Sequence, residues 1–539
     1  MNLKMIRKQM LALLLAIPLL YAISLTQVRI NTIKKREKLT DTNIIKNAPP
    51  IVAFVTIALG SFRGLFADIL WLRSASLQEK GQYYEMVQLA SWITKLQPRF
   101  TGATAYLAWN MAYNISVTCS SFEDRWRWVR KGIELIRDEA LQYNPSDPVL
   151  YKELGWIYQH KIGNIMDDAN LFYKNRMAVD IMNIVGKTDI DWQALADAPK
   201  NEKEIEKLAN LDKTFWKALK TRDPDFRTKY KNMSEIERDF KLFGGVPEKV
   251  KIALKGDQKR IKKLDNYFRS KWFKEKYKMD PAMIVDLNKK YGKLDWRLPE
   301  AHAIYWANMG IKNDIDDKVN IDCDRMISQS LKDAFMGGKL MMADPDNTAT
   351  FMTIPNLALA DAAVNNFKQA FKRQKSKSFN DAMRNFLKDV IVMMYTYGKY
   401  SQANKFLKML RKEEPGNKKL KTTLDRFVIR EWKEDVRDAT TKQAMDVIGG
   451  LVYSAYYMYA CGSEDEADGH IRLAEGVYNV YKKDHADTWK RVGLPPFEDI
   501  KKKMAALCRQ NLMYLKQASA RQPQSKNDKK SQTKKSKKQ

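Results

Sequence analysis

Four side chains that could perform acid–base chemistry lie close together in the sequence: Asp295, Arg297, Glu300 and His302. A carboxyl group and an imidazole held near each other are a common pair of proton donor and acceptor in enzymes. The same segment has the features of a helix start, because Pro299 suits the first turn and the Glu300 carboxylate favours the positive end of the helix dipole. We interpret it as a helix start. Catalysis by this group is the alternative, and it requires a deep polar pocket there.

The cysteines do not suggest a metal site or a disulfide framework. There is no C-x-x-C pair, and no histidine stands at the spacing of a metal ligand. Four thiols in 539 residues cannot form a disulfide scaffold. We expect lone core or surface thiols at Cys119, Cys323, Cys461 and Cys508.

Two further patterns resemble ligand-binding loops without completing them. An acidic run lacks the mid-loop glycine and the final glutamate of a calcium-binding EF-hand, so we expect a solvated loop between helices. Its members are Asp314, Asp316, Asp317, Asp322 and Asp324. Gly186, Lys187 and Thr188 match the end of a phosphate-binding loop, but Ile181 replaces its first glycine. The sequence therefore predicts no catalytic residue, no metal and no cofactor, and hence a protein that is not an enzyme.

The basic charge is concentrated in three segments. In total, 95 Lys and Arg stand against 64 Asp and Glu, a net charge of +31. Residues 1–38 and 518–539 each hold eight basic residues and one acidic residue, and residues 201–300 hold 27 basic and 17 acidic residues. The segment 518–539 has almost no apolar side chains, so we predict a disordered basic tail. Binding of RNA, ribosomes or anionic lipid through the tail and the Lys-rich segment is the alternative function, although nucleic-acid-binding proteins more often gather their charge on a folded face.

The N-terminus contains a predicted transmembrane anchor. Residues 9–28 are uncharged, and at ~1.5 Å per residue a helix of this length spans ~30 Å, the thickness of the hydrocarbon core of a bilayer. Residues 1–8 form a basic N-terminus before it, and residues 29–50 form a linker after it. Cleavage as a signal peptide is the alternative, but the apolar run is longer than usual for one. The second apolar stretch, Ile51–Leu59, is too short to span a bilayer, so we expect a buried core helix or a helix at the membrane surface.

The rest of the chain has the pattern of an all-α protein. Apolar residues recur three and four positions apart, as in Trp126, Val129, Ile133 and Ile136. Alternating runs rich in β-branched residues are nearly absent, which argues against a parallel sheet with crossover helices.

Glycine, alanine and proline recur at related spacings within this pattern. Gly81 and Gly398 each precede a proline by 17 residues, while Gly398 and Gly462 precede Ala403 and Ala467 by five. A glycine in the left-handed conformation ends the first helix of a hairpin. A small alanine lets the second helix cross closely against the first, and proline then stops the second helix.

These spacings resemble the tetratricopeptide repeat (TPR), a helix-turn-helix unit of about 34 residues. Met86, which stands where a small residue is expected, departs from that pattern. The segments Asn47–Arg73 and Leu294–Ala307 resemble a group of uncharacterised bacterial envelope proteins with one N-terminal span and a TPR-like body. The resemblance implies a bacterial membrane-anchored repeat protein and supplies no catalytic residues.

We therefore expect a transmembrane helix followed by a degenerate TPR-like α-solenoid, with repeats at 51–200 and 301–517 and a Lys-rich helical insert at 201–300. In a solenoid each hairpin buries one face against its neighbours and leaves the other as an extended binding surface. The expected function is a membrane-tethered scaffold that binds protein or peptide partners during assembly of a bacterial envelope complex. The expected location is the inner membrane, with a single span and the body in the periplasm.

Overall fold

A computed structural model of the chain describes most of the predicted helical body. Isolated positions between 18 and 33 are described, and the longer described ranges are 63–97, 100–164, 166–186, 190–220, 230–317, 319–342, 351–436, 441–486 and 493–521. Most of the predicted anchor, the linker, Ile51–Leu59 and residues 522–539 lie outside these ranges.

The chain divides into two compact units. Unit 1 comprises the chain up to Leu107 together with Glu134–Ser146, and unit 2 comprises Ala108–Ile133 together with the chain from Asp147 onward. Each unit is described by itself below.

The described residues are mostly helical, which confirms the prediction of an all-α protein. Within the ranges given above, the only sheet is an antiparallel pair of short strands, β1 (Lys339–Met342) and β2 (Phe351–Ile354). Lys339 lies opposite Ile354 in this pair. A search of the described residues finds no helix with the length and apolar character needed to cross a bilayer.

Unit 1 is built around a pair of packed helices, α3 and α4. Its elements are α3 (Arg63–Glu79), α4 (Tyr83–Leu96), most of α5 (Thr101–Asn110), the π-helical turn η4 (Leu135–Ala140) and α8 (Leu141–Tyr143). Ala67 and Leu77 of α3 and Met86, Ala90 and Ile93 of α4 are buried. This pair therefore has a small core of its own, to which α4 contributes residues spaced three and four positions apart on one helix face.

Unit 2 contains the other described elements. In chain order they are η3 (Met111–Ile115), α6 (Ser116–Thr118), α7 (Phe122–Glu134), α9 (Pro148–Trp156), η5 (Ile157–Ile162), α10 (Asn170–Val185), α11 (Trp192–Ala196), α12 (Glu202–Leu208), α13 (Lys213–Lys220), α14 (Met233–Phe243), α15 (Glu248–Ala253), α16 (Gln258–Tyr277), α17 (Pro281–Tyr291), α18 (Pro299–Asn313), α19 (Asn320–Gly337), β1, β2, η7 (Leu357–Leu359), α20 (Ala360–Gln374), α21 (Lys377–Thr396), α22 (Tyr400–Glu413), η8 (Lys418–Leu420), α23 (Leu424–Val436), α24 (Thr441–Ala460), α25 (Glu464–Asp484) and α27 (Phe497–Arg521).

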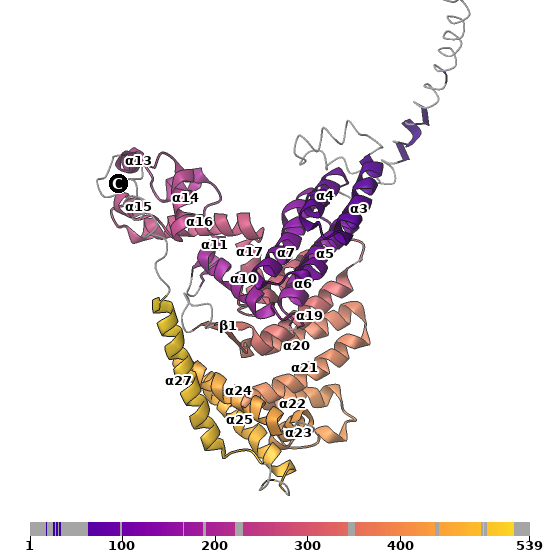
Figure 1. Cartoon of the computed structure of the whole chain (residues 1–539), viewed down its shortest axis with the longest axis vertical. Coiled ribbons are helices and arrows are strands. Elements are labelled where there is room, and N and C mark those ends of the chain that lie inside the picture. Colours follow the sequence, from indigo (N-terminus) through magenta and orange to yellow (C-terminus); the bar gives the residue numbers. More distant parts are fainter. Residues whose placement is uncertain are drawn as a thin grey trace, which may run out of the picture. The chain divides into compact units, whose positions relative to one another are not determined.

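Helices that follow one another in the chain also lie side by side in the later part of unit 2. Helix α18 packs against α9 and α19. Helices α19, α20, α21 and α22 each pack against the next helix (Figure 1). Nearer the C-terminus, α25 packs against α23 and α24, and α24 packs against α27. Helix α27 continues to Arg521, so it includes the first residues of the segment predicted as a tail.

Three helix pairs are joined by the same glycine turn. Gly81, Gly398 and Gly462 have φ angles of 69°, 70° and 76°, in the left-handed region. In each turn the glycine N–H donates to the carbonyl three residues back at 2.9–3.0 Å, and the next N–H donates to the carbonyl five residues back at 2.8–2.9 Å. The longer-range bond is that of a Schellman motif, which satisfies carbonyls at the helix end. The prediction that these glycines end the first helix of a hairpin is confirmed.

The alanines that follow two of these turns are fully buried. Ala403 lies near the start of α22 and Ala467 near the start of α25, and neither exposes measurable surface. Met86 occupies the corresponding place in α4 and is equally buried. The position thus faces the hairpin interior in all three pairs, and α3 and α4 accommodate a larger side chain there.

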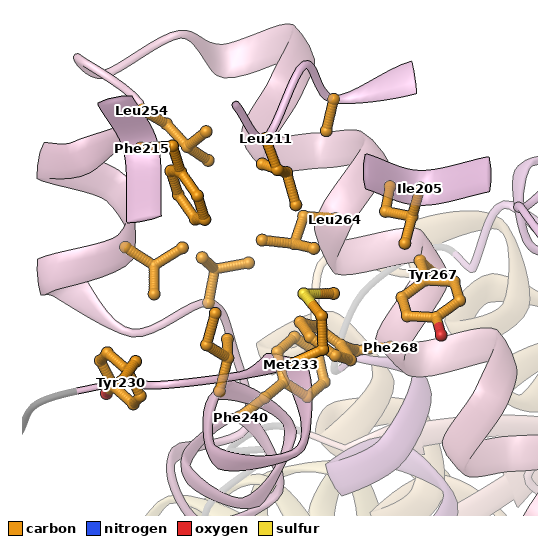
Figure 2. Close-up of a cluster of buried hydrophobic side chains, with 14 of the residues drawn as sticks. Ile205, Leu211, Phe215, Tyr230, Met233, Phe240, Leu254, Leu264, Tyr267 and Phe268 are labelled. Carbon is orange, nitrogen blue, oxygen red and sulfur yellow. The ribbon is translucent and has the colours of Figure 1, made fainter. Parts of the chain in front are cut away.

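The described residues of the Lys-rich segment 201–300 are mostly helical, as predicted for a helical insert, and the helices from α12 to α16 enclose an apolar cluster. Figure 2 shows side chains of this cluster, including Phe215, Phe240 and Phe268, gathered between α13, α14, α15 and α16. Lysines such as Lys203 and Lys217 are exposed. Burying the apolar faces stabilises these helices at about 25 cal/mol per Å² of surface removed from water, while the lysines stay hydrated.

Candidate functional site

The structure separates the four residues that the sequence places together before and within α18. Arg297 donates from Nε and Nη2 to the two carboxylate oxygens of Asp295, at 2.8 and 2.7 Å. The backbone N–H of Leu340 in β1 donates to the same carboxylate at 2.9 Å. This ion pair therefore fastens the start of α18 to the strand pair, a structural role.

His302 is part of an aromatic core and is not among the residues that line the cleft described below. Its ring is fully buried, and Nε2 lies 2.9 Å from the carbonyl oxygen of Trp296, to which it donates. The rings of Tyr158 and Tyr277 lie 4.9 and 5.5 Å from the imidazole. Helix α18 begins at Pro299 with Glu300 in its first turn, so the predicted helix start is confirmed.

Glu300 alone of the four residues lines a cleft. The cleft lies within unit 2, has a volume of about 910 Å³, and is formed by α9, η5, α10, α18, α19 and β2. The Glu300 side chain is almost completely buried, with 8% of the residue exposed. Its Oε1 lies 3.7 Å from Nζ of Lys174, whereas its Oε2 is buried with no hydrogen-bond partner among the described residues. A buried acceptor without a donor is unfavourable, so this oxygen is the prominent polar feature of the cleft.

A second carboxyl group, Asp333, lines the same cleft. Nε2 of Gln329 donates to Oδ1 of Asp333 at 2.8 Å. Burial raises the pKa of the Asp333 carboxyl, although that hydrogen bond opposes the change. Burial likewise raises the pKa of Glu300, which the charge of Lys174 offsets only in part. The two carboxyl groups are thus in an environment with too few donors and too little positive charge for both to ionise easily.

Aromatic and apolar side chains form another part of the cleft wall. The ring of Trp156 stacks on that of His160, with ring centres 4.8 Å apart and an angle of 11° between the planes. Trp156 and Met336 are each 39% exposed, so both present apolar surface to solvent. Burial lowers the pKa of His160, and the neighbouring charge of Lys161 adds to this effect. His160 is therefore neutral at neutral pH.

Two local features of α9 and η5 place these side chains. Gly155 has no side chain where a Cβ would come within 2.6 Å of Sδ of Met326 and 3.4 Å of the Ala303 carbonyl, so α9 can lie close to α18 and α19. The helix then widens into the π-helical turn η5, which contains Gln159 and His160. Such turns shift the register of side chains and recur at functional sites.

Of the cleft residues, the sequence pointed to Glu300 as a candidate for chemistry and to Asp322 only as part of the acidic run. Lys174, Asp333 and Trp156 lie on three helices separated by long stretches of chain, and none belongs to a short motif. Only the tertiary packing of α9, α10 and α19 against α18 brings them near Glu300, so no spacing signal was available.

The acidic run after α18 is only partly the solvated loop that was predicted. Oδ2 of Asp314 accepts from the backbone N–H of Val319 at 2.7 Å, which closes the loop between α18 and α19. The prediction of a loop is wrong for Asp322, which is exposed but lies in the first turn of α19, and for Asp324, which is fully buried within α19. Its carboxylate accepts from Arg373 and, at 2.9 Å, from Gln374, both near the end of α20. The charge is buried because α20 supplies donors that the local sequence does not reveal.

The other sequence motifs do not form a site in the described ranges. Cys323 and Cys508 are buried, and Cys119 and Cys461 are half-buried, all as free thiols. A search of the described residues finds no group of three or more His, Cys, Asp and Glu side chains that could hold a metal ion. Gly186 ends α10 with a φ of 107°, and Lys187 and Thr188 lie outside the described ranges.

Comparison of this chain with models of protein families, with curated proteins and with solved structures finds no match. The cleft in unit 2 therefore has to be interpreted from its own residues.

The buried carboxyl group of Glu300 predicts a pH-dependent difference between the wild type and Glu300→Gln. Because the pKa is higher in the folded chain than in the unfolded chain, ionised Glu300 costs stability above its folded pKa, and this cost vanishes as pH falls below the unfolded value of about 4.3. Glutamine does not ionise. The difference in free energy of unfolding, variant minus wild type, should therefore fall between about pH 8 and pH 4.5, by about 1.4 kcal/mol per unit of pKa elevation.

Urea unfolding of the full chain in detergent at several pH values measures this difference. Glu248→Gln, at an exposed position in α15, is the matched control. A difference between Glu300→Gln and the wild type that is constant across this pH range would contradict the prediction.

Proposed function

We propose that this protein is a membrane-tethered scaffold built from degenerate TPR-like helical repeats, and that it binds partner proteins during assembly of a bacterial envelope complex. The observation that carries the proposal is the recurrence of one construction in three helix pairs: a left-handed glycine turn with the same two hydrogen bonds, followed by a buried small or apolar residue. Repeats of this kind cannot bury their apolar faces alone and so stack on neighbours, as the successive packing of α18 to α22 illustrates.

The packing between helix pairs in unit 2 supports a repeat architecture. Gly469 of α25 has no side chain where a Cβ would lie 2.8 Å from the ring of Tyr397, just after α21. Nε of Arg472 in α25 donates to the carbonyl of Thr396 at 3.0 Å, so it satisfies an end carbonyl of α21. Helix α25 is therefore fitted to the end of an earlier hairpin as well as to α24.

An exposed apolar face on α3 supports attachment to a membrane. Leu65, Phe66, Ile69 and Leu72 are each 46–69% exposed, while Ala67 is buried on the opposite side of the helix. Soluble proteins rarely leave such a row open to water. The face follows directly, in the sequence, the apolar stretch Ile51–Leu59 and the predicted anchor, so a lipid surface is its natural environment in this proposal.

Purification from detergent-solubilised membranes tests the proposed function. The full chain, tagged at its C-terminus, should stay in the membrane fraction after alkaline carbonate and should retain a protein partner in about 0.5 M salt, where surface electrostatics is screened. A variant lacking residues 522–539, which keeps α27 whole, should retain the same partner.

The alternative is a basic protein that binds RNA, ribosomes or anionic lipid through its charged segments. Loss of the partner in high salt, or on removal of the tail, would favour that alternative. Recovery of the chain alone at every salt concentration would contradict the scaffold proposal.

A further inference from the structure

The Glu300 cleft holds a buried carboxylate oxygen without a donor in the described ranges, beside a second carboxyl group that is half-buried. Oε2 of Glu300 is buried and has no hydrogen-bond partner among the described residues. The carboxylate of Asp333 accepts a hydrogen bond from Gln329. Ionised carboxylates can accept several hydrogen bonds through their two oxygens. The cleft is therefore suited to a ligand that brings donors.

The positive charges around the cleft are mostly engaged elsewhere. Nζ of Lys152 lies 2.8 Å from Glu153, Nη1 of Arg325 lies 3.8 Å from Asp322, and Nζ of Lys332 lies 3.0 Å from Asp389. His160 is neutral because burial lowers its pKa. Lys174 is left as the one ammonium group that approaches Glu300 within the described ranges, and its charge also acts on Asp333.

The carboxyl groups of Glu300 and Asp333 both lie near the charge of Lys174, and Asp333 also lies near that of Lys332. Because Lys332 pairs with Asp389 as well, the two carboxyl groups are together short of positive charge. A ligand cation would supply both the missing charge and donors for Oε2 of Glu300. An anionic ligand would add repulsion to a site that already lacks positive charge. A metal ion finds no set of three ligands within the described part of the chain.

The cleft wall also suits a flat or long-stemmed cation. Trp156 is held in place by stacking on His160 and still exposes 39% of its surface. Guanidinium groups stack on such rings, and the alkyl stems of arginine and lysine pack on apolar surface such as that of Met336. The cleft is open to solvent and large enough for one side chain together with its backbone.

We propose that this cleft binds an arginine or lysine side chain presented by a partner protein, with the guanidinium or ammonium group paired to Glu300 and Asp333 beside Trp156. This inference rests on the proposed scaffold function and specifies the chemistry of its partner. Arginine is favoured over lysine, because its planar fork can donate to both carboxylates and stack on the indole ring at once.

Binding of matched small probes to the full chain in detergent tests the inference. The probes are N-acetyl-arginine methylamide, its citrulline analogue, in which a neutral urea replaces the guanidinium, and the glutamate analogue. Isothermal titration should show at least about tenfold tighter binding of the arginine probe than of the citrulline probe, equivalent to about 1.4 kcal/mol. Glu300→Gln should reduce binding of the arginine probe to the level of the citrulline probe.

Two further variants guard against an effect of misfolding. Asp333→Asn should weaken binding of the arginine probe in the same direction. Asp381→Asn changes an exposed carboxylate of α21 that pairs with Arg384 and does not line the cleft, and it should leave the preference for arginine intact. Equal binding of arginine and citrulline, tighter binding of glutamate, or no effect of Glu300→Gln in a variant with unchanged circular dichroism would overturn the inference.

The same variant separates this inference from the scaffold proposal. If the partner recovered from membranes binds Glu300→Gln as well as it binds the wild type, the cleft assignment fails while the scaffold function stands. If no partner is recovered but arginine is still preferred over citrulline, the cleft chemistry stands and the scaffold function fails.

Discussion

Trp296→Ala should lower the free energy of unfolding of unit 2 by about 3–5 kcal/mol, the range for removing a large aromatic side chain from a packed core. Trp296 is among the largest side chains that are almost fully buried, with 1% exposed. Its ring packs edge-on to Trp192 at 6.1 Å, and its Nε1 donates to Oδ1 of Asn288 at 3.0 Å. The alanine variant would leave both a cavity and a half-buried amide oxygen, that of Asn288, with one donor fewer.

Urea unfolding followed by circular dichroism measures this loss. Phe243→Ala in α14, also in unit 2, is the control, because Phe243 is 71% exposed and its removal should cost less than about 1 kcal/mol. Equal effects of the two substitutions would contradict the assignment of Trp296 to the core.

Arg373→Met should destabilise unit 2 by about 2–3 kcal/mol at neutral pH, because it leaves the buried Asp324 carboxylate with too few donors. Asp324 is fully buried, and Nε of Arg373 lies 3.2 Å from its Oδ2. Gln374 still donates to this carboxylate in the variant, which keeps the loss below that expected for a fully isolated charge. Arg373 is itself partly exposed, so most of the expected loss comes from the buried carboxylate of Asp324.

The double substitution Arg373→Met with Asp324→Leu isolates the reason for this effect. Removing both charges should recover part of the stability, since no uncompensated charge remains. Arg325→Met, which removes an exposed arginine of α19, is the control and should change the unfolding midpoint little. A double variant less stable than Arg373→Met would contradict the account of a buried charge.

The features that were predictable from the sequence are those set by local backbone chemistry. Gly81, Gly398 and Gly462 were identified because a left-handed helix end strongly favours glycine, and the following alanine or methionine lies at a fixed offset on the next helix. Pro299 marked a helix start for a different but equally local reason: proline lacks the N–H donor that a residue inside a helix needs. These signals depend only on neighbouring residues, so they can be recognised in the sequence without knowledge of the tertiary structure.

The candidate site was only partly predictable because its geometry is not local. Glu300 stood out as a carboxyl group near a histidine. The two residues are only two positions apart in α18, so their side chains point in different directions, and His302 lies in an aromatic core while Glu300 lines the cleft. Lys174 and Asp333 meet Glu300 only through the packing of α10 and α19. Asp324 was assigned to a loop by composition, and its burial depends on donors from α20.

Site-specific photo-crosslinking from the cleft is the most direct test of the claim that this scaffold holds a partner in unit 2. A photoreactive amino acid at Met336, which lines the cleft, should give a discrete protein adduct in cells that express the full chain, and the adduct should disappear with Glu300→Lys. The same group at Lys372, an exposed position of α20 that does not line the cleft, should give no such adduct. Absence of a protein adduct from Met336, or the same adduct from both positions, would contradict the claim.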